Sequence, residues 1–260
     1  MVQITCLENI LNKDHSQSTS FRIEPLEIGQ AITLGNSLRR VLLSDLTDYG
    51  IKGIRINDIK NEYSSIPFVR EDPLEIIANL KQILFCESIL THQDSKVSKN
   101  FAVPAFLFAA GPKIVTAGLI KLPKNTLTII NPEQYICTVI KHSDFYCELD
   151  IGKSKEFHFK NSSDRSPETN NFSSAKPKTI LIDYPYSPVI NVGFKVKLIY
   201  DSQGNLKEAL QLEIITKGTK SPKRCLQEAL KSLSDLFYSL LGDSLALHIL
   251  SDISKKIKDK

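Results

Sequence analysis

The sequence predicts an α+β protein in which a discontinuous outer domain carries an inserted, β-rich domain. Three observations lead to this prediction. An amphipathic helix is predicted close to the N-terminus, a second long helix lies near the C-terminus, and short strands and turns fill the chain between them. Because the apolar faces of the two helices both need covering, we expect the chain ends to share one domain around the inserted middle.

Length and composition narrow the class of protein. The chain has 260 residues, of which 42% are hydrophobic and 24% charged, and its net charge of +4 is mild. The five cysteines are dispersed without a C-x-x-C pair, so we expect reduced thiols and no zinc site. No apolar run approaches ~18 residues, so no membrane span is expected. The first twenty residues lack a leader pattern, so we expect either synthesis in the compartment where the protein works or a targeting segment that is absent from this sequence.

The first helix is predicted over 29–46, after a short strand at 21–23. Arg39 and Arg40 lie just off its apolar stripe, and polar residues followed by Gly50 are expected to end it. The stripe recurs at steps of three and four residues, which places it on one helical face. It consists of Ala31, Leu34, Leu38, Val41, Leu42 and Leu46.

The next part of the chain should form a strand at 54–59, a loop at 61–70 and a helix at 72–85. We expect Tyr63 and Phe68 to anchor the loop. Asp72 suits the N-cap and Pro73 the first helical position, since both complement the free N–H groups of a helix start. The residues expected to face inward are Leu74, Ile77, Leu80 and Leu84.

The middle of the chain reads as strands, with β-rich runs at 127–130, 135–140 and 145–151. The segment 152–178 is rich in serine, asparagine and lysine, and we expect a mobile excursion there. It is either a solvated insertion or a basic loop that touches a nucleic-acid backbone or an acidic partner.

Regular structure is expected again from Thr179. A hairpin should follow, with strands at 192–200 and 210–214 around a turn at 201–205. Ser221 and Pro222 then begin the last helix, for which Gly242 is a plausible residue just past the end. Its leucines recur at about 3.5 residues, a period that suits packing on another helix. We expect this helix to meet the first one within one chain, between two copies, or both; alternatively each helix packs on its own sheet.

No catalytic motif is present in the sequence. There is no phosphate-binding glycine loop, nucleophile elbow or zinc-protease pattern, and the five histidines are isolated. A thiol enzyme built around Cys137 or Cys147 is an alternative, but an assembly subunit without chemistry of its own fits these absences better.

Several short blocks follow one another in a fixed order along the chain. They are EPLE at 24–27, TLGNSLRRVLLS at 33–44, EYSSI at 62–66, VRED at 69–72, NLK at 79–81, GP at 111–112, NPEQYIC at 131–137, YSPV at 186–189 and LEI to TKG at 212–218. Together these blocks resemble the α subunit of bacterial-type RNA polymerase. The resemblance runs from about residue 20 to 241, and the ending at 235–237 is similar to plastid versions.

The resemblance implies a homodimer on which the β and β′ subunits assemble, with an outer domain at 1–48 and 189–260 and an inserted domain at 49–188. The implied dimer interface comprises Leu34, Leu38, Leu42, Leu226, Ala229, Leu230, Leu233, Leu236 and Phe237. The implied β and β′ docking residues are Glu24, Arg39, Arg40, Ser44, Glu62, Tyr63, Ser64, Arg70, Glu71, Asp72, Tyr186 and Lys217.

The resemblance also implies what this chain does not do. No cofactor is expected in it, because the catalytic Mg²⁺ of such polymerases belongs to β′. The chain stops at Lys260, so the family's C-terminal DNA-binding domain either has been lost or is missing from a truncated form, and we expect this chain to contact DNA only through the assembled complex. Arg40 occupies the position at which an arginine of the family helps to hold the β subunit. The polar segment 152–178 replaces a glycine- and arginine-rich stretch of the family.

The lysine and isoleucine bias and the absence of a transit peptide favour a plastid, with a bacterial cytoplasm as the alternative. The alternative function is a stand-alone basic nucleic-acid-binding module that uses 152–178 and the lysine-rich tail, and it predicts salt-dependent DNA binding.

Overall fold

The computed structural model describes residues 2–57, 59, 61–87, 103–123, 126–155, 179–201 and 203–258. The protein is mixed α+β and its sheets are antiparallel, which confirms the predicted fold class. The chain divides into two compact units. Unit 1 comprises Met1–Leu46, Val189–Thr216 and Ser221–Lys260, and unit 2 comprises Thr47–Pro188 and Lys217–Lys220.

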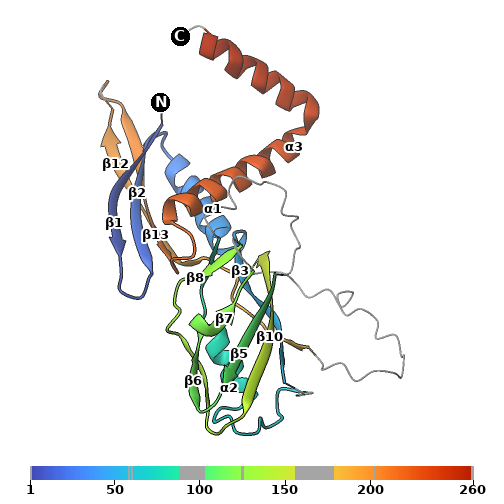
Figure 1. Cartoon of the computed structure of the whole chain (residues 1–260). Helices are drawn as coiled ribbons and strands as arrows, with labels where there is room; N and C mark the ends of the chain where they lie inside the picture. Colours follow the sequence, from blue (N-terminus) through green and yellow to red (C-terminus); the bar gives the residue numbers. More distant parts are fainter. Residues whose placement is uncertain are drawn as a thin grey trace. The chain divides into compact units, whose positions relative to one another are not determined.

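Unit 1 contains one four-stranded sheet and two helices. The strand order is β1-β2-β13-β12, so the N-terminal hairpin pairs with the hairpin formed late in the sequence (Figure 1). The elements are β1 (Gln3–Leu11), β2 (Gln17–Leu26), α1 (Gln30–Ser44), β12 (Val189–Tyr200), β13 (Leu206–Thr216) and α3 (Pro222–Lys258).

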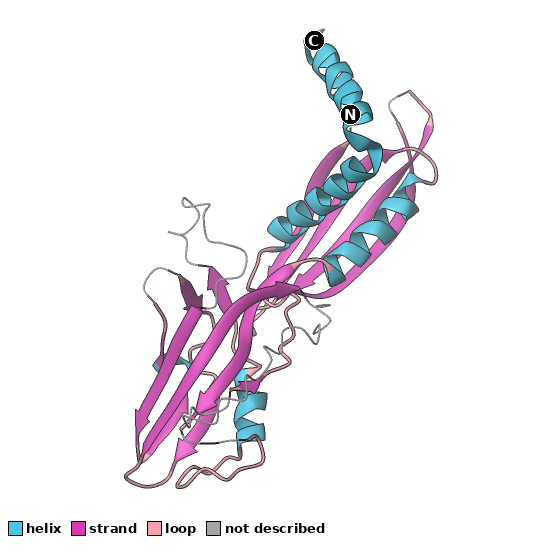
Figure 2. Ribbon diagram, turned by 90° about the vertical axis from the view of Figure 1, so that its right-hand side faces the viewer, coloured by secondary structure: helices cyan, strands magenta, loops and turns pink. Residues whose placement is uncertain are grey.

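Both helices of unit 1 cover the same face of this sheet, as Figure 2 shows. Alternate residues of the strands point toward the helices, because side chains of a strand alternate between its faces. Leu210, Leu212 and Ile214 of β13 are fully buried there. Gly35 lets α1 approach the sheet closely, since a Cβ at this position would lie 2.7 Å from the ring of Phe194.

The elements of unit 1 differ from the prediction in two places, strand β1 and the end of helix α3. Strand β1 was not predicted, because a bulge between Cys6 and Glu8 breaks its alternation and all of its residues are exposed. The start of α3 is confirmed: Ser221 precedes it and its Oγ accepts from the N–H of Arg224 at 3.4 Å. The prediction that α3 ends at Gly242 is wrong, since the helix continues to Lys258.

Unit 2 is built on a five-stranded sheet of order β11-β3-β10-β5-β7, with two small sheets, β4-β8 and β6-β9. The strand-rich reading of the middle of the chain is therefore confirmed. The elements are β3 (Thr47–Ile56), α2 (Pro73–Leu80), β4 (Phe85–Glu87), β5 (Val103–Ala110), β6 (Lys113–Thr116), the short 3₁₀ helix η2 (Ala117–Leu119), β7 (Ile120–Lys121), β8 (Leu127–Ile129), β9 (Tyr135–Val139), β10 (Asp144–Lys155) and β11 (Ile180–Leu181).

Helix α2 begins where the sequence predicts, with Asp72 at the N-cap and Pro73 first, although the Asp72 side chain makes no capping hydrogen bond. It ends at Leu80 rather than at residue 85 because Phe85 pairs with Ile129 in a sheet. Leu74 is exposed, so its predicted inward orientation is wrong; Ile76 takes the buried position.

The short segment Lys217–Lys220 belongs to unit 2, although both of its neighbours in sequence belong to unit 1. Its anchor is Asp48, a buried carboxylate at the start of β3. Oδ2 of Asp48 accepts from the Thr219 hydroxyl at 2.7 Å, and Oδ1 accepts from the N–H of Tyr49 at 2.9 Å. Burial raises the pKa of Asp48 to about 6, against the opposing pull of Lys220 and Lys217.

The polar excursion predicted at 152–178 is only partly testable. Residues up to Lys155 continue strand β10, so the predicted excursion begins too early. Residues 156–178 lie outside the described residues.

Candidate protein interfaces

Metal-ligating side chains and buried cysteines of the described residues bear on the chemical alternatives. Across these residues, no group of three or more His, Cys, Asp or Glu side chains could hold a metal ion. Nor does the described part contain a helix with the length and apolar character needed to cross a membrane. Burial raises the pKa of the Cys137 thiol to about 12, and burial also raises the pKa of the Cys147 thiol. A reactive cysteine needs a lowered pKa, so the geometry disfavours the thiol-enzyme alternative.

The predicted dimer stripe divides into a buried and an exposed part. Five of its residues form the core of unit 1, where the two helices pack on the sheet: Leu38, Leu42, Leu226, Ala229 and Leu233. Each exposes 9% or less of its surface, so almost nothing remains for a second copy to cover. Within one chain these five side chains belong to the core of unit 1, and their part in a dimer interface stays a prediction.

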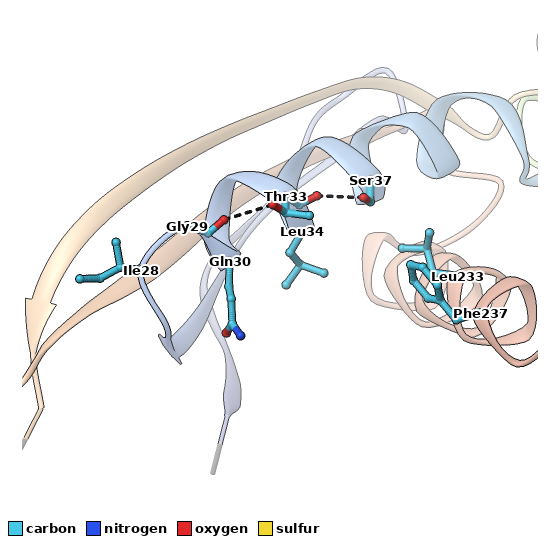
Figure 3. A pocket seen from close by; sticks show the side chains of 8 residues that line it. All are labelled: Ile28, Gly29, Gln30, Thr33, Leu34, Ser37, Leu233 and Phe237. Atoms are coloured by element: carbon cyan, nitrogen blue, oxygen red, sulfur yellow. Dashed lines mark hydrogen bonds between the residues drawn. The ribbon is translucent and has the colours of Figure 1, made fainter. Parts of the chain in front are cut away.

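The other predicted residues lie at the surface. Leu34 and Leu230 are half-buried, whereas Leu236 and Phe237 are 53% and 57% exposed on α3. Leu34 on α1 and Leu233 and Phe237 on α3 line a groove of about 290 Å³, and Figure 3 shows their side chains facing the space between the helices. The remaining lining residues are Ile28, Gly29, Gln30, Thr33 and Ser37.

Three exposed apolar residues in or just before the two helices were not assigned to the interface from sequence: Ile28, Ile32 and Leu240. Leu240 is 74% exposed and follows Phe237 by three residues on α3, so the exposed apolar strip extends along the helix. The sequence signal was available, because Leu240 continues the same stripe. We call Leu34, Leu236, Phe237 and Leu240, together with Ile28 and Ile32, the helix-pair surface.

The two adjacent arginines of α1 have different surroundings. The guanidinium of Arg39 donates to the backbone carbonyl of Val192 on β12, so this residue ties the helix to the sheet. Arg40 is exposed, and within the described residues its guanidinium has no hydrogen-bond or ion-pair partner. Of the pair, Arg40 is the cation available to another protein.

Two further predicted docking residues belong to unit 1. Glu24 on β2 forms an ion pair with Arg22, with Oε2 and Nε 2.7 Å apart. The Ser44 hydroxyl donates to the carbonyl of Arg40 at 2.8 Å, which closes the last turn of α1. Both residues therefore contribute to local structure.

The loop at 61–70 in unit 2 presents aromatic side chains to solvent. Tyr63 is 79% exposed and Phe68 is 50% exposed, so the prediction that they anchor the loop is wrong. The buried anchor is Ile66, whose carbonyl also accepts from the N–H of Val69 at 3.4 Å. Ser64 donates to the Asn61 side chain within the loop, and Glu62 is half-buried.

Glu71 fixes the end of this loop. Its buried carboxylate accepts from the Tyr135 hydroxyl, from the N–H of Thr138 at 2.7 Å and from Nε of Arg70 at 2.8 Å. Burial alone would raise the pKa of Glu71, but these hydrogen bonds prevail and lower it. The side chain of Arg70 is 64% exposed, so its guanidinium is both anchored and presented to solvent.

The last two predicted docking residues, Tyr186 and Lys217, also belong to unit 2. The Tyr186 ring lies 5.4 Å from that of Tyr184, and burial raises the pKa of Tyr186 to about 12. Nζ of Lys217 donates to the carbonyl of Pro185 at 3.1 Å. These contacts hold the chain around 185–188 against the segment at 217–220.

Comparison with known proteins identifies the relatives of this chain. A family model described as the RNA polymerase Rpb3/RpoA insert domain matches residues 54–187, a span that lies within unit 2. Proteins named DNA-directed RNA polymerase subunit alpha are similar over most of the chain. That of Phaeodactylum tricornutum is 38% identical over 242 residues, covering 93% of this chain and 72% of the relative.

Two further relatives with the same name give the same result. The protein of Porphyra purpurea is 34% identical over 238 residues, which cover 92% of this chain and 70% of the relative. The protein of Cyanidium caldarium is 37% identical over 240 residues, which cover 92% of this chain and 71% of the relative.

Proposed function

The chain belongs to the family of DNA-directed RNA polymerase α subunits, and from that premise we propose that it pairs with a second copy to form the scaffold on which β and β′ assemble. In this proposal the chain contributes no catalytic group. The magnesium ion that supports nucleotidyl transfer is held by β′, and DNA is reached only through the assembled enzyme.

The observation that carries this proposal is the helix-pair surface. Three large apolar side chains at 236, 237 and 240 are more than half exposed, next to a groove between α1 and α3. Contiguous exposed apolar area of this kind is typical of protein interfaces and costs free energy in water. A second copy, presenting the same strip across a two-fold axis, would cover it in a self-complementary way.

The mass of the chain in solution tests the dimer. We expect a dimer for the natural sequence and a monomer for the double variant Leu236→Glu, Phe237→Glu, because paired carboxylates cannot be buried at an apolar interface without partners. Both sites are exposed, so the variant should still fold. Ile140→Glu, at an equally exposed site in unit 2, is the control and should remain dimeric. A natural chain that is monomeric at micromolar concentration would contradict the proposal.

For β, the proposed contact is Arg40. A guanidinium can donate two parallel hydrogen bonds to a carboxylate or to backbone carbonyls, and Arg40 is an exposed residue of α1. The exposed guanidinium of Arg70 and the ring of Tyr63 in unit 2 are proposed as further contacts with the large subunits.

We also propose that the polymerase works in a plastid. The support comes from the relatives, which are α subunits from algae, together with the lysine and isoleucine bias of the sequence. The alternative function is a stand-alone nucleic-acid-binding module. It depends on the segment 156–178 and on the C-terminal tail, whose side chains the structure does not describe. Membership of the α-subunit family favours the polymerase interpretation over this alternative.

A further inference from the structure

Strand β5 in unit 2 is apolar on both of its faces. Its inward residues are buried, as expected, in the core of the unit. Its outward residues are Pro104, Phe106, Phe108 and Ala110, and all four are exposed. An antiparallel sheet with one face in water normally carries polar residues on that face. The phenylalanines, 43% and 51% exposed, are therefore unexplained by the fold of the chain itself.

The neighbouring strand β10 completes an aromatic strip. Phe108 lies opposite Tyr146 in the sheet, and Phe106 lies opposite Glu148. The rings of Phe106 and Tyr146 stack with centroids 6.4 Å apart and planes inclined by 23°. Three aromatic side chains from two strands thus form one surface, which we call the aromatic strip (Phe106, Phe108, Tyr146).

Carboxylates border the aromatic strip along β10. The outward residues of this strand, besides Tyr146, are Asp144, Glu148 and Asp150. Arg55 on β3 is their cationic neighbour, with Nε 2.6 Å from Glu148 and Nη2 3.9 Å from Asp150. Asp144 is exposed and has no ion pair within the described residues. Arg55 thus pairs with two of the three carboxylates and Asp144 has no ion pair within the described residues, so carboxylates outnumber guanidinium groups on this side of the strip.

The opposite side of the aromatic strip carries the reverse charge. Lys121 on β7 lies opposite Phe106 in the sheet and is exposed. The surface is thus polarised across the strands, from carboxylates on β10 through apolar side chains on β5 to an ammonium group on β7. Such a pattern favours one orientation of a bound segment over its reverse.

We propose that the aromatic strip and its acidic border form a docking surface for a basic, amphipathic segment of another protein. Apolar side chains of that segment would cover Phe106 and Phe108, and arginine or lysine side chains would lie over the carboxylates of β10. Arginine is favoured because it pairs with carboxylates and also stacks on aromatic faces.

Charge distinguishes this partner from a nucleic acid. Exposed rings on a sheet can stack bases, and that mode of binding requires cations that follow the phosphates. Here the strand next to the rings presents carboxylates, which would repel a phosphate backbone. The proposed surface belongs to unit 2 and is independent of the helix-pair surface in unit 1.

The test uses the full chain and a short fluorescent peptide of alternating leucine and arginine. We expect saturable binding, with the dissociation constant raised about tenfold or more by Phe106→Ser with Phe108→Ser, since apolar contacts of this kind dominate interface energies. Asp144→Asn with Asp150→Asn should weaken binding and flatten its salt dependence. The control Ile114→Ser, at an exposed apolar site on β6 of the same unit, should bind as the natural chain does.

Two comparison probes complete the test. A leucine–glutamate peptide and oligothymidylate should not bind. The proposal is overturned by absence of leucine–arginine binding, by binding that the serine and asparagine variants leave unchanged, or by oligothymidylate binding that the serine variant abolishes. Because all four substitutions are on the outward face, the variants should keep the native circular dichroism spectrum. Their dimer mass reports separately on the function proposed above.

Discussion

The buried carboxylate of Glu208 accepts a hydrogen bond from the backbone N–H of Ala31, with Oε2 and N 3.1 Å apart. Glu208 lies on β13 and Ala31 in the first turn of α1, 177 residues away in sequence. The N-cap residue of the helix is Gly29, which has no side chain to satisfy the free N–H groups. A strand from the far end of the chain therefore caps the first helix.

This cap predicts a graded loss of stability. Glu208→Gln keeps an acceptor but loses the favourable interaction of a negative charge with the helix N-terminus, about 0.5–1 kcal/mol. Glu208→Ala leaves the Ala31 N–H buried without an acceptor and should cost about 1–3 kcal/mol. Urea unfolding measures both. Glu213→Ala, at an exposed site on the same strand, is the control, and an alanine variant at 208 as stable as the natural chain would contradict the capping role.

The close approach of Gly35 to Phe194 predicts that even a methyl group is too large there. Gly35→Ala should gain about 1 kcal/mol from helix propensity but lose about 1–3 kcal/mol from overpacking, because the new Cβ would lie 2.7 Å from the ring. We expect a net loss in thermal unfolding, reversed when Phe194→Leu is added. Gly193→Ala meets nothing within 4 Å and should be neutral; equal effects of the two alanine substitutions would refute this packing argument.

The different surroundings of the two arginines predict different phenotypes. Arg40→Glu should leave the fold and the dimer intact and abolish co-purification with β, since its guanidinium has no partner in the described part of the chain. Arg39→Gln should lose the bond to the Val192 carbonyl and lower the free energy of unfolding by about 1 kcal/mol. Co-purification and urea unfolding measure the two effects, and the proposed β contact fails if Arg40→Glu still binds β normally.

Because its pKa is raised, Asp48 should make a contribution to the free energy of unfolding that decreases as pH rises. Its pKa is about 6 in the folded chain, above the usual value of 3.8, so the folded state binds more protons between these values. The contribution is fully present below about pH 4 and is lost as pH rises through 6, a change of about 3 kcal/mol at most. Asp48→Asn should remove it.

The measurement is the difference in unfolding free energy between the natural chain and Asp48→Asn at several pH values. We expect the natural chain to lose stability relative to the variant from pH 4 to pH 7. Taking the difference cancels groups such as Glu71, whose lowered pKa contributes with the opposite sign. A difference that does not vary with pH would show that Asp48 titrates normally.

Much of the fold could be predicted from local sequence. The starts of α2 and α3 follow from Asp72-Pro73 and Ser221-Pro222, because capping and proline geometry involve only neighbouring residues. The hairpin of β12 and β13 follows from strict alternation around a turn. Strand β1 could not be predicted, because its bulge disrupts the period and none of its residues is buried.

The sequence by itself determined the family, the mixed α+β class and the apolar stripes of the two long helices, since these depend on residue order and spacing. Only the tertiary structure decided how each stripe is used. Periodicity shows that Leu38, Leu226 and Phe237 need covering, but it cannot show what covers them. The structure buries the first two within one chain and leaves Phe237 exposed. The reason is that burial depends on contacts between segments far apart in the sequence, as does the cap that Glu208 provides to α1.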